Sequence, residues 1–243
     1  MKVLVTGGFG HIGSALLRSS LKDLCSQITI VDDMSTDRYC SFFNLPTGCE
    51  YVTRIGDAQI VVDEALVSSV DTVIHLAGRT NAVASHEEPT STLGNNLRIT
   101  KHIADLCSQV NTPLSDTSAP QSPYAECKLQ EEEVVASLSG TTPYLIFRFG
   151  TIFGPSPGMR FHTAVNRFCW QASNRLPVTV WQTSLKQRRP YLHLEDALLA
   201  LCTAARLDEL PDQIVNVASL STTVETILDE IRRAGLPLTV NLV

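Results

Sequence analysis

Residues 2–17 have the sequence KVLVTGGFGHIGSALL, and this stretch decides the fold. Lys2–Thr6 is rich in β-branched residues and predicts a strand, while the glycines of 7–13 predict a tight turn. Apolar residues then recur at helical spacing over residues 14–24. Glycine lets the backbone approach a pyrophosphate, whose charge is favoured by the N–H groups at a helix start. We therefore expect a dinucleotide-binding turn made by Gly7, Gly10, His11, Ile12 and Gly13.

An acidic residue follows at the spacing that this turn requires. Gln27–Asp33 (QITIVDD) predicts the second strand, and Asp32 stands at its end, where a carboxylate can accept hydrogen bonds from ribose hydroxyls. A 2′-phosphate would meet the negative charge of Asp32 and Asp33, which favours NAD over NADP. Arg38 is the nearby residue that would favour NADP instead.

Composition excludes several other classes of protein. The chain has 243 residues and a net charge of −6, which predicts a single globular unit and argues against a nucleic-acid binder. No apolar run approaches the roughly 18 residues of a membrane helix. Seven cysteines without a CxxC pair predict neither a disulfide framework nor a zinc site. We expect a cytoplasmic protein, without a bound metal.

Strand and helix patterns alternate along the first 154 residues, as in an α/β fold with a doubly wound parallel sheet (a Rossmann sheet). The pattern breaks after Gly154 at two prolines and a glycine. We therefore expect a dinucleotide-binding domain over 1–154 and a smaller C-terminal substrate-binding lobe over 155–243. Residues 213–218 form a strand pattern that is a candidate to rejoin the core sheet. Within a helix expected at 123–138, we expect Glu131, Glu132 and Glu133 to face solvent.

Tyr124 and Lys128 are the candidate catalytic pair. Their spacing places them one turn apart on the same helix face. A free tyrosine titrates near 10, and a fixed ammonium beside it would favour the phenolate. Such a phenolate could take a proton from a sugar hydroxyl while a hydride leaves the same carbon for the nicotinamide.

Several motifs, taken together and in this order, resemble the extended short-chain dehydrogenase/reductase family, and in particular its NAD-dependent nucleotide-sugar epimerase/dehydratase branch. The matching segments are TGGFGHIG (6–13), VDDMS (31–35), GD (56–57), HLAG (75–78), NLRIT (96–100), YAECK (124–128), RFGTIFGP (148–155) and RPYLHLED (189–196). His75 and His193 lie inside these motifs, and we interpret both as structural residues at strand ends.

The resemblance implies roles for residues beyond the turn and the Tyr–Lys pair. It implies cofactor contacts for Asp32, Asp33, Met34, Ser35, Asp57, Ala58, Leu76, Ala77, Gly78, Asn96, Tyr124 and Lys128. It implies substrate contacts for Thr151, Asn166, Trp181 and Arg189, with Asn166 and Arg189 at the diphosphate. Thr151 stands where the family usually has an asparagine.

One segment departs from the family pattern. The family has a central parallel strand before the tyrosine, followed by a serine or threonine that bonds the substrate; residues 111–123 (NTPLSDTSAPQSP) do not predict such a strand. We expect this strand to be missing near residues 113–116, and the sequence to lack a segment there and another after Val243. Ser115, Thr117 and Ser118 are therefore not assigned the family's hydroxyl role. In the family's 4,6-dehydratases an Asp-Glu pair follows that threonine.

The function expected from the resemblance is an NAD-dependent epimerase of the 4-epimerase type, which acts on a nucleotide-diphosphate sugar through a transient keto-sugar. The alternatives are a nucleotide-sugar 4,6-dehydratase, an NADP-dependent ketone reductase of the same fold, and a non-catalytic dinucleotide-binding regulator. We expect the chain to form a homodimer, and to bind neither nucleic acid nor a membrane.

Overall fold

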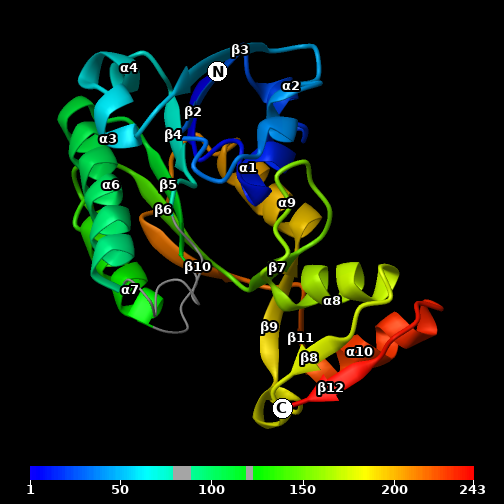
Figure 1. The fold of residues 1–243 in the computed structure, drawn as a ribbon. Coiled ribbons are helices and arrows are strands. Elements are labelled where there is room, and N and C mark those ends of the chain that lie inside the picture. Colours follow the sequence, from blue (N-terminus) through cyan, green and yellow to red (C-terminus); the bar gives the residue numbers. More distant parts are fainter. Residues whose placement is uncertain (79–88, 119–122) are drawn as a thin grey trace.

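The computed structural model describes residues 1–78, 89–118 and 123–243, without the side chains of 89–93, 116–118 and 123–126. It contains a seven-stranded sheet with helices on both faces and a smaller lobe beside it (Figure 1). All neighbouring strands of this sheet are parallel. In spatial order the strands are β10 (Gln213–Val217), β6 (Tyr144–Phe149), β5 (Leu114–Ser118), β4 (Thr72–His75), β1 (Lys2–Thr6), β2 (Gln27–Asp32) and β3 (Glu50–Ile55). The α/β parallel sheet expected from the sequence is therefore present.

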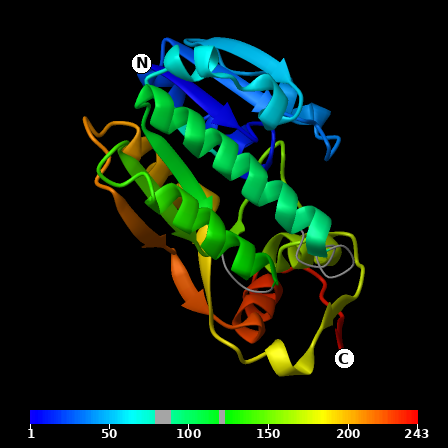
Figure 2. The same cartoon turned by 90° about the vertical axis from the view of Figure 1, so that its left-hand side faces the viewer.

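The helices divide between the two faces of the sheet according to their apolar sides. One face is covered by α1 (His11–Leu16), α2 (Leu21–Leu24) and α9 (Leu194–Ala204). The other is covered by α3 (Ala58–Val61), α4 (Glu64–Ser68), α6 (Pro89–Val110) and α7 (Pro123–Ala136). The last two lie side by side (Figure 2). None of the helices in the described ranges has the length and apolarity needed to cross a membrane.

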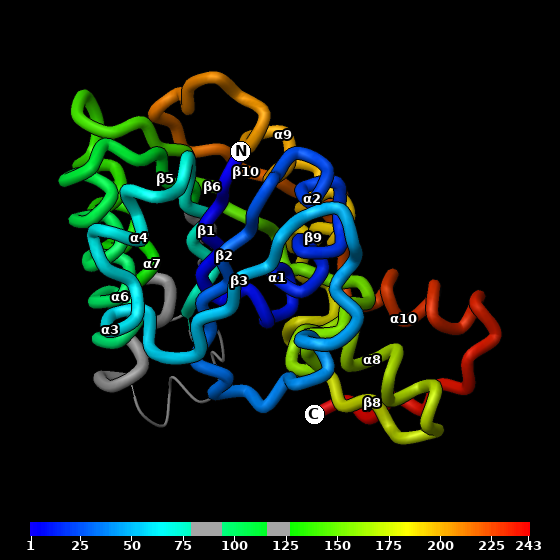
Figure 3. The backbone as a smooth tube through the Cα atoms, turned by 90° about the horizontal axis from the view of Figure 1, so that it is seen from above, coloured from blue at the N-terminus to red at the C-terminus, as the bar shows by residue number. Residues whose placement is uncertain are grey.

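The lobe has its own small core. A three-stranded sheet contains β7 (Thr151–Phe153), β9 (Arg189–His193) and β11 (Leu220–Thr222), and a second pair joins β8 (Val178–Val180) to β12 (Val240–Leu242). Apolar residues of α8 (Ala164–Ser173) and α10 (Val224–Arg233) pack against these strands. The backbone trace shows both helices near β8 (Figure 3). The chain leaves the core sheet after β6, builds most of the lobe, and returns to the core through α9 and β10. The division at residue 154 stays a prediction.

The central strand that the sequence analysis expects to be missing is present as β5, so that expectation is wrong. β5 pairs with β4 on one side, where Leu114 faces Val73, and with β6 on the other, where Leu114 faces Tyr144. Leu114 is fully buried, and Pro113 O accepts a hydrogen bond from Val73 N at 2.8 Å. The residues between α6 and α7 are enough to form β5, which completes the seven-stranded sheet.

Two features of this segment hide the strand in the sequence. The segment LSDTS has one large apolar residue, so neither hydropathy nor alternation identifies it as buried. Its place in the sheet depends instead on backbone hydrogen bonds to two neighbours. The crossover that a parallel strand needs is supplied by α6 before β5 and by α7 after it, so residues 111–123 need to hold only a short strand and a turn.

We expect Leu114→Ala to lower the free energy of unfolding by about 2–5 kcal/mol, because it leaves a cavity at the centre of the sheet. Leu220→Ala on β11 is the control, since that side chain is 44% exposed and should cost under about 1 kcal/mol. Denaturant unfolding measures both. Equal, small losses would show that β5 is not a core strand.

Candidate functional site: a dinucleotide cradle at the carboxyl edge of the sheet

The glycine-rich turn lies in direct backbone contact with the end of β4. Gly7 has φ +69°, and a Cβ placed there would lie 2.7 Å from backbone atoms of Leu76 and Ala77. A Cβ on Gly13 would lie 2.5 Å from Gly7 O, so α1 begins against the turn itself. Gly10 N donates to Gly7 O at 3.1 Å. His11 and Ile12 form the first turn of α1, as the dinucleotide pattern requires.

Asp32 is tied to this turn by a hydrogen bond. Its Oδ2 accepts from Phe9 N at 2.9 Å, and its Oδ1 accepts from Met34 N at 2.9 Å. Burial raises the pKa of Asp32, and these two N–H donors oppose that shift. The next carboxylate, Asp33, is exposed and accepts from Ser35 N. The residues expected at the adenosine ribose therefore stand directly beside the turn expected at the pyrophosphate.

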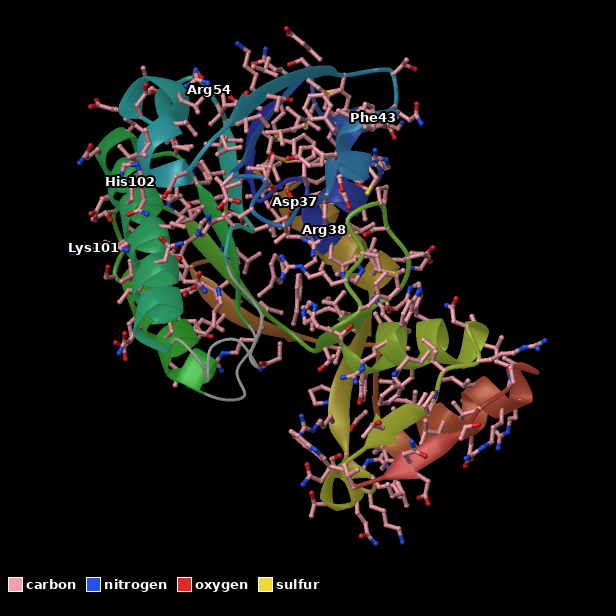
Figure 4. All side chains as sticks on the ribbon, viewed as in Figure 1. Asp37, Arg38, Phe43, Arg54, Lys101 and His102 are labelled. Atoms are coloured by element: carbon pink, nitrogen blue, oxygen red, sulfur yellow. The ribbon has the colours of Figure 1, made fainter. Side chains whose placement is uncertain are left out.

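Arg38 follows Asp32 on the same loop and adds a positive charge near it. Figure 4 shows Asp37 and Arg38 close together near α1, whereas Lys101 and His102 lie on α6, at a distance from them. Arg38 Nη1 donates to Thr36 Oγ1 at 2.7 Å. Burial lowers the pKa of Arg38, and the charge of Asp32 raises it, so the two groups interact electrostatically.

Further residues for which the resemblance implies cofactor contacts also lie at this edge. Asp57 caps α3 by accepting from Gln59 N at 2.9 Å, and Ala58 is buried behind it. Gly78 follows β4 and packs next to the side chain of Asn96, which is buried on α6.

A loop from the lobe closes over the glycine-rich turn, which the sequence analysis did not anticipate. A Cβ on Gly158 would lie 2.4 Å from Gly10 O, and Gly158 N donates to Ser14 Oγ at 2.9 Å. Ser156 Oγ donates to His11 O at 2.9 Å. His11 Nε2 lies 2.9 Å from Gly154 O, so it must carry the proton. The segment Pro155–Gly158, at which the strand and helix pattern of the sequence ends, therefore contacts the glycine-rich turn and α1.

Lys128 is buried on α7, and its Nζ lies 2.5 Å from Oε2 of the equally buried Glu131. Glu132 is also buried and pairs with Arg148 of β6. The expectation that these two glutamates face solvent is therefore wrong, although Glu133 is exposed. A run of three glutamates predicts a solvent-facing surface. Glu131 and Glu132 are buried instead because each carboxylate has a cationic partner, Lys128 or Arg148, that offsets the cost of removing its charge from water. Tyr124 lies in the first turn of α7, and its side chain is outside the described part of the chain.

His75 occupies the centre of a small buried polar network. Its Nδ1 lies 2.6 Å from Thr6 Oγ1 and its Nε2 lies 3.2 Å from Thr100 Oγ1, so one ring connects β1, β4 and α6. Burial lowers the pKa of His75 to about 4, and the charge of Lys128 adds to this shift. A neutral, structural histidine accounts for these contacts.

The four residues expected to bind substrate lie in the lobe and at its junction with the core. Asn166 is buried on α8, where its Oδ1 accepts from Gly154 N at 3.0 Å and its Nδ2 donates to Arg160 O at 3.3 Å. Thr151 begins β7, and Arg189 begins β9 with its Nη2 bonded to Gln187. Trp181 follows β8 and is 71% exposed. Their roles toward a substrate stay predictions.

These features fit a dinucleotide. The turn offers backbone without side chains where a pyrophosphate must approach closely, and Asp32 is held beside it at the end of β2. The model of the NAD-dependent epimerase/dehydratase family matches residues 3–115 and 108–218, which together cover most of the chain. The chain belongs to this family. Its two matched stretches overlap at residues 108–115, where the sequence departs from the family pattern.

Curated relatives of the chain include both enzyme types of the family's name. It is 27% identical over 252 aligned positions to an uncharacterised UDP-glucose epimerase of Bacillus subtilis, with 89% of this chain and 76% of that protein covered. It is 26% identical over 268 positions to a dTDP-D-glucose 4,6-dehydratase of Dictyostelium discoideum, with 92% of this chain but only 59% of the relative covered.

Solved structures confirm the fold. A UDP-glucuronic acid 4-epimerase variant from Bacillus cereus, solved with a substrate analogue and NAD, superposes with a TM-score of 0.87 at 20% identity. The alignment covers all of this chain and 86% of that one. A Thermus thermophilus UDP-glucose 4-epimerase in complex with NAD gives 0.81 at 22% identity, over 99% and 86% of the two chains.

The buried His75 should make stability depend on pH. Because its folded pKa is lowered from 6.5 to about 4, the unfolded chain binds a proton that the folded protein does not. Its contribution is complete above pH 6.5 and is lost as the pH falls toward 4. Between pH 7.5 and 5 we expect this residue to lower the free energy of unfolding by about 2 kcal/mol. The loss arises below pH 6.5, at about 1.4 kcal/mol per pH unit.

Denaturant unfolding at both pH values tests this prediction. In His75→Gln the loss between pH 7.5 and 5 should be about 2 kcal/mol smaller than in the wild type, because glutamine does not titrate. Equal losses in wild type and His75→Gln would contradict the assignment of a neutral buried ring.

Proposed function

We propose that this protein is an NAD-dependent epimerase, of the 4-epimerase type, that acts on a nucleotide-diphosphate sugar. Two observations support NAD as the cofactor. The chain belongs to an NAD-dependent family, and its glycine-rich turn lies beside Asp32 in a fold that also buries Lys128. The named epimerase relatives support a UDP-hexose as the substrate class. When bound, NAD would supply the hydride acceptor that the transient oxidation of the sugar needs.

The chain's own residues would divide the remaining work. Gly10 leaves room for the pyrophosphate, while Gly7 and Gly13 let the turn pack closely against the end of β4 and the start of α1. Asp32 accepts from the adenosine ribose, and Asp57 lies on the adenine side. Lys128 presents an ammonium one helical turn after Tyr124, which favours the phenolate at that tyrosine. Tyr124 then accepts the proton of the sugar hydroxyl and returns it after the keto-sugar has turned over in the site.

The lobe would hold the diphosphate and the base. Arg189 begins β9 with a planar guanidinium suited to phosphate oxygens, and Asn166 fixes the loop at Gly154 that closes on the turn. Trp181 offers an exposed aromatic face to a base. Thr151 stands on β7, which pairs with β9. Thr117 and Ser118 end β5, and become candidates for the hydroxyl beside Tyr124 now that this strand is placed.

The sequence after β5 favours the epimerase over the 4,6-dehydratase. Elimination in dehydratases of this family requires an Asp-Glu pair after the strand's threonine. From Thr117 to Pro123 the chain has the sequence TSAPQSP, which contains no acidic residue. A general acid–base pair for removing water from the sugar is therefore not available in that segment.

Two further properties belong to this proposal. The α6–α7 pair, with Leu129 exposed on α7, is the surface on which we expect the homodimer to form. All seven cysteines are free, which supports a reducing compartment such as the cytoplasm.

The test is Tyr124→Phe, assayed with UDP-glucose and UDP-galactose by chromatography of the products. We expect interconversion of the two sugars by the wild type, and a loss of at least about 100-fold in the variant, because acid–base catalysis typically contributes 10²–10⁴-fold. Tyr39→Phe is the control, since the side chain of Tyr39 is exposed at the start of a short 3-10 helix (Tyr39–Phe42). A product that has lost water would identify a dehydratase, and unchanged turnover in Tyr124→Phe would contradict the proposed base.

A further inference from the structure

Glu131 forms a buried ion pair with Lys128, the lysine of the Tyr–Lys pair. Its carboxylate is almost completely inaccessible, and Oε2 lies 2.5 Å from Lys128 Nζ. Oε1 accepts a hydrogen bond from Cys127 Sγ at 3.2 Å. Both carboxylate oxygens are therefore held by α7 itself, one by a thiol and one by the ammonium.

The charges around this pair show what Glu131 balances. Burial raises the pKa of the Cys127 thiol to about 12, so it is a neutral donor, and His75 on β4 is neutral because its pKa is lowered to about 4. On the other elements packed against α7, the described charged side chains are engaged elsewhere or exposed. Arg148 of β6 pairs with Glu132, while Arg98, Lys101 and Asp105 of α6 are exposed. Among these described groups, the carboxylate that meets Lys128 is that of Glu131.

An ammonium at this depth needs such a partner. Leaving one member of a buried pair without its counter-charge is strongly unfavourable. The Glu131 carboxylate also fixes the direction of the lysine stem, because one of the three N–H donors of Nζ is committed to Oε2. The other donors are then oriented by the same bond.

We propose that Glu131 is a positioning residue that holds the Lys128 ammonium in place for the nicotinamide ribose, and so sets the affinity for NAD. The proposal rests on the NAD site of the proposed function. It does not require Glu131 to contact the cofactor, because its effect passes through Lys128.

Glu131→Gln tests this directly, with NAD titrated into the purified protein and its Kd measured by calorimetry. We expect a Kd about tenfold higher, equivalent to ~1.4 kcal/mol. Glu132→Gln is the matched control, because Glu132 is the next residue on the helix, is equally buried, and pairs with Arg148. Both variants should unfold at lower temperature, but Glu132→Gln should bind NAD within about twofold of the wild type, a difference under ~0.5 kcal/mol.

A second pair of measurements separates positioning from a general structural effect. In a Lys128→Met background, Glu131→Gln should cause no further change in the Kd, since the residue through which it acts is gone. Glu131→Asp keeps the charge but withdraws it by one methylene. It should fold and still bind NAD about threefold more weakly, or ~0.6 kcal/mol.

The possible results are distinct. Wild-type affinity in Glu131→Gln or Glu131→Asp, or a further loss in the Lys128→Met background, would overturn the positioning role. A wild-type protein that does not bind NAD would instead overturn the proposed function.

Discussion

The absence of side chains at the glycine-rich turn is the constraint on which the rest of the structure depends. At Gly7 the turn contacts the end of β4, at Gly13 it contacts the start of α1, and at Gly158 a loop of the lobe contacts its carbonyls. A Cβ at any of these positions would lie within 2.7 Å of backbone atoms. Backbone cannot move aside as a flexible side chain can, so these contacts fix four segments relative to one another.

The polar groups of the site take their positions from this packing. Phe9 N reaches Asp32 because the turn lies over the end of β2, and Thr6 reaches His75 because β1 and β4 are neighbours. Lys128 and Glu131 are close enough to the neutral His75 to affect its pKa, and their own opposite charges compensate each other in a buried region. The site therefore combines a backbone surface without side chains with a fixed carboxylate and a fixed ammonium.

The sequence predicted those parts of the fold that depend on local pattern. The turn at 7–13, the acid at the end of β2 and the alternation of strands and helices follow from glycine spacing and hydropathy, and all appear in the structure. β5 could not be recognised, because LSDTS is a strand through its two neighbours and not through its own apolar residues. Glu131 and Glu132 were placed on the wrong face for a similar reason, since their cationic partners are visible only in three dimensions. The closure of Gly158 on Gly10 joins residues about 150 positions apart, and no local pattern encodes it.

The most direct test of this account compares NAD with NADP as ligands of the wild-type protein. Asp32, held beside the turn by Phe9 N, would face the 2′-phosphate of NADP. Like charges about 4 Å apart repel by roughly 4 kcal/mol at an effective dielectric constant of 20. We expect NADP to bind at least about 30-fold more weakly than NAD, or ~2 kcal/mol, even with Arg38 on the same loop. Equal or tighter binding of NADP would show that Arg38, and not Asp32, controls the ribose site, and would contradict the account.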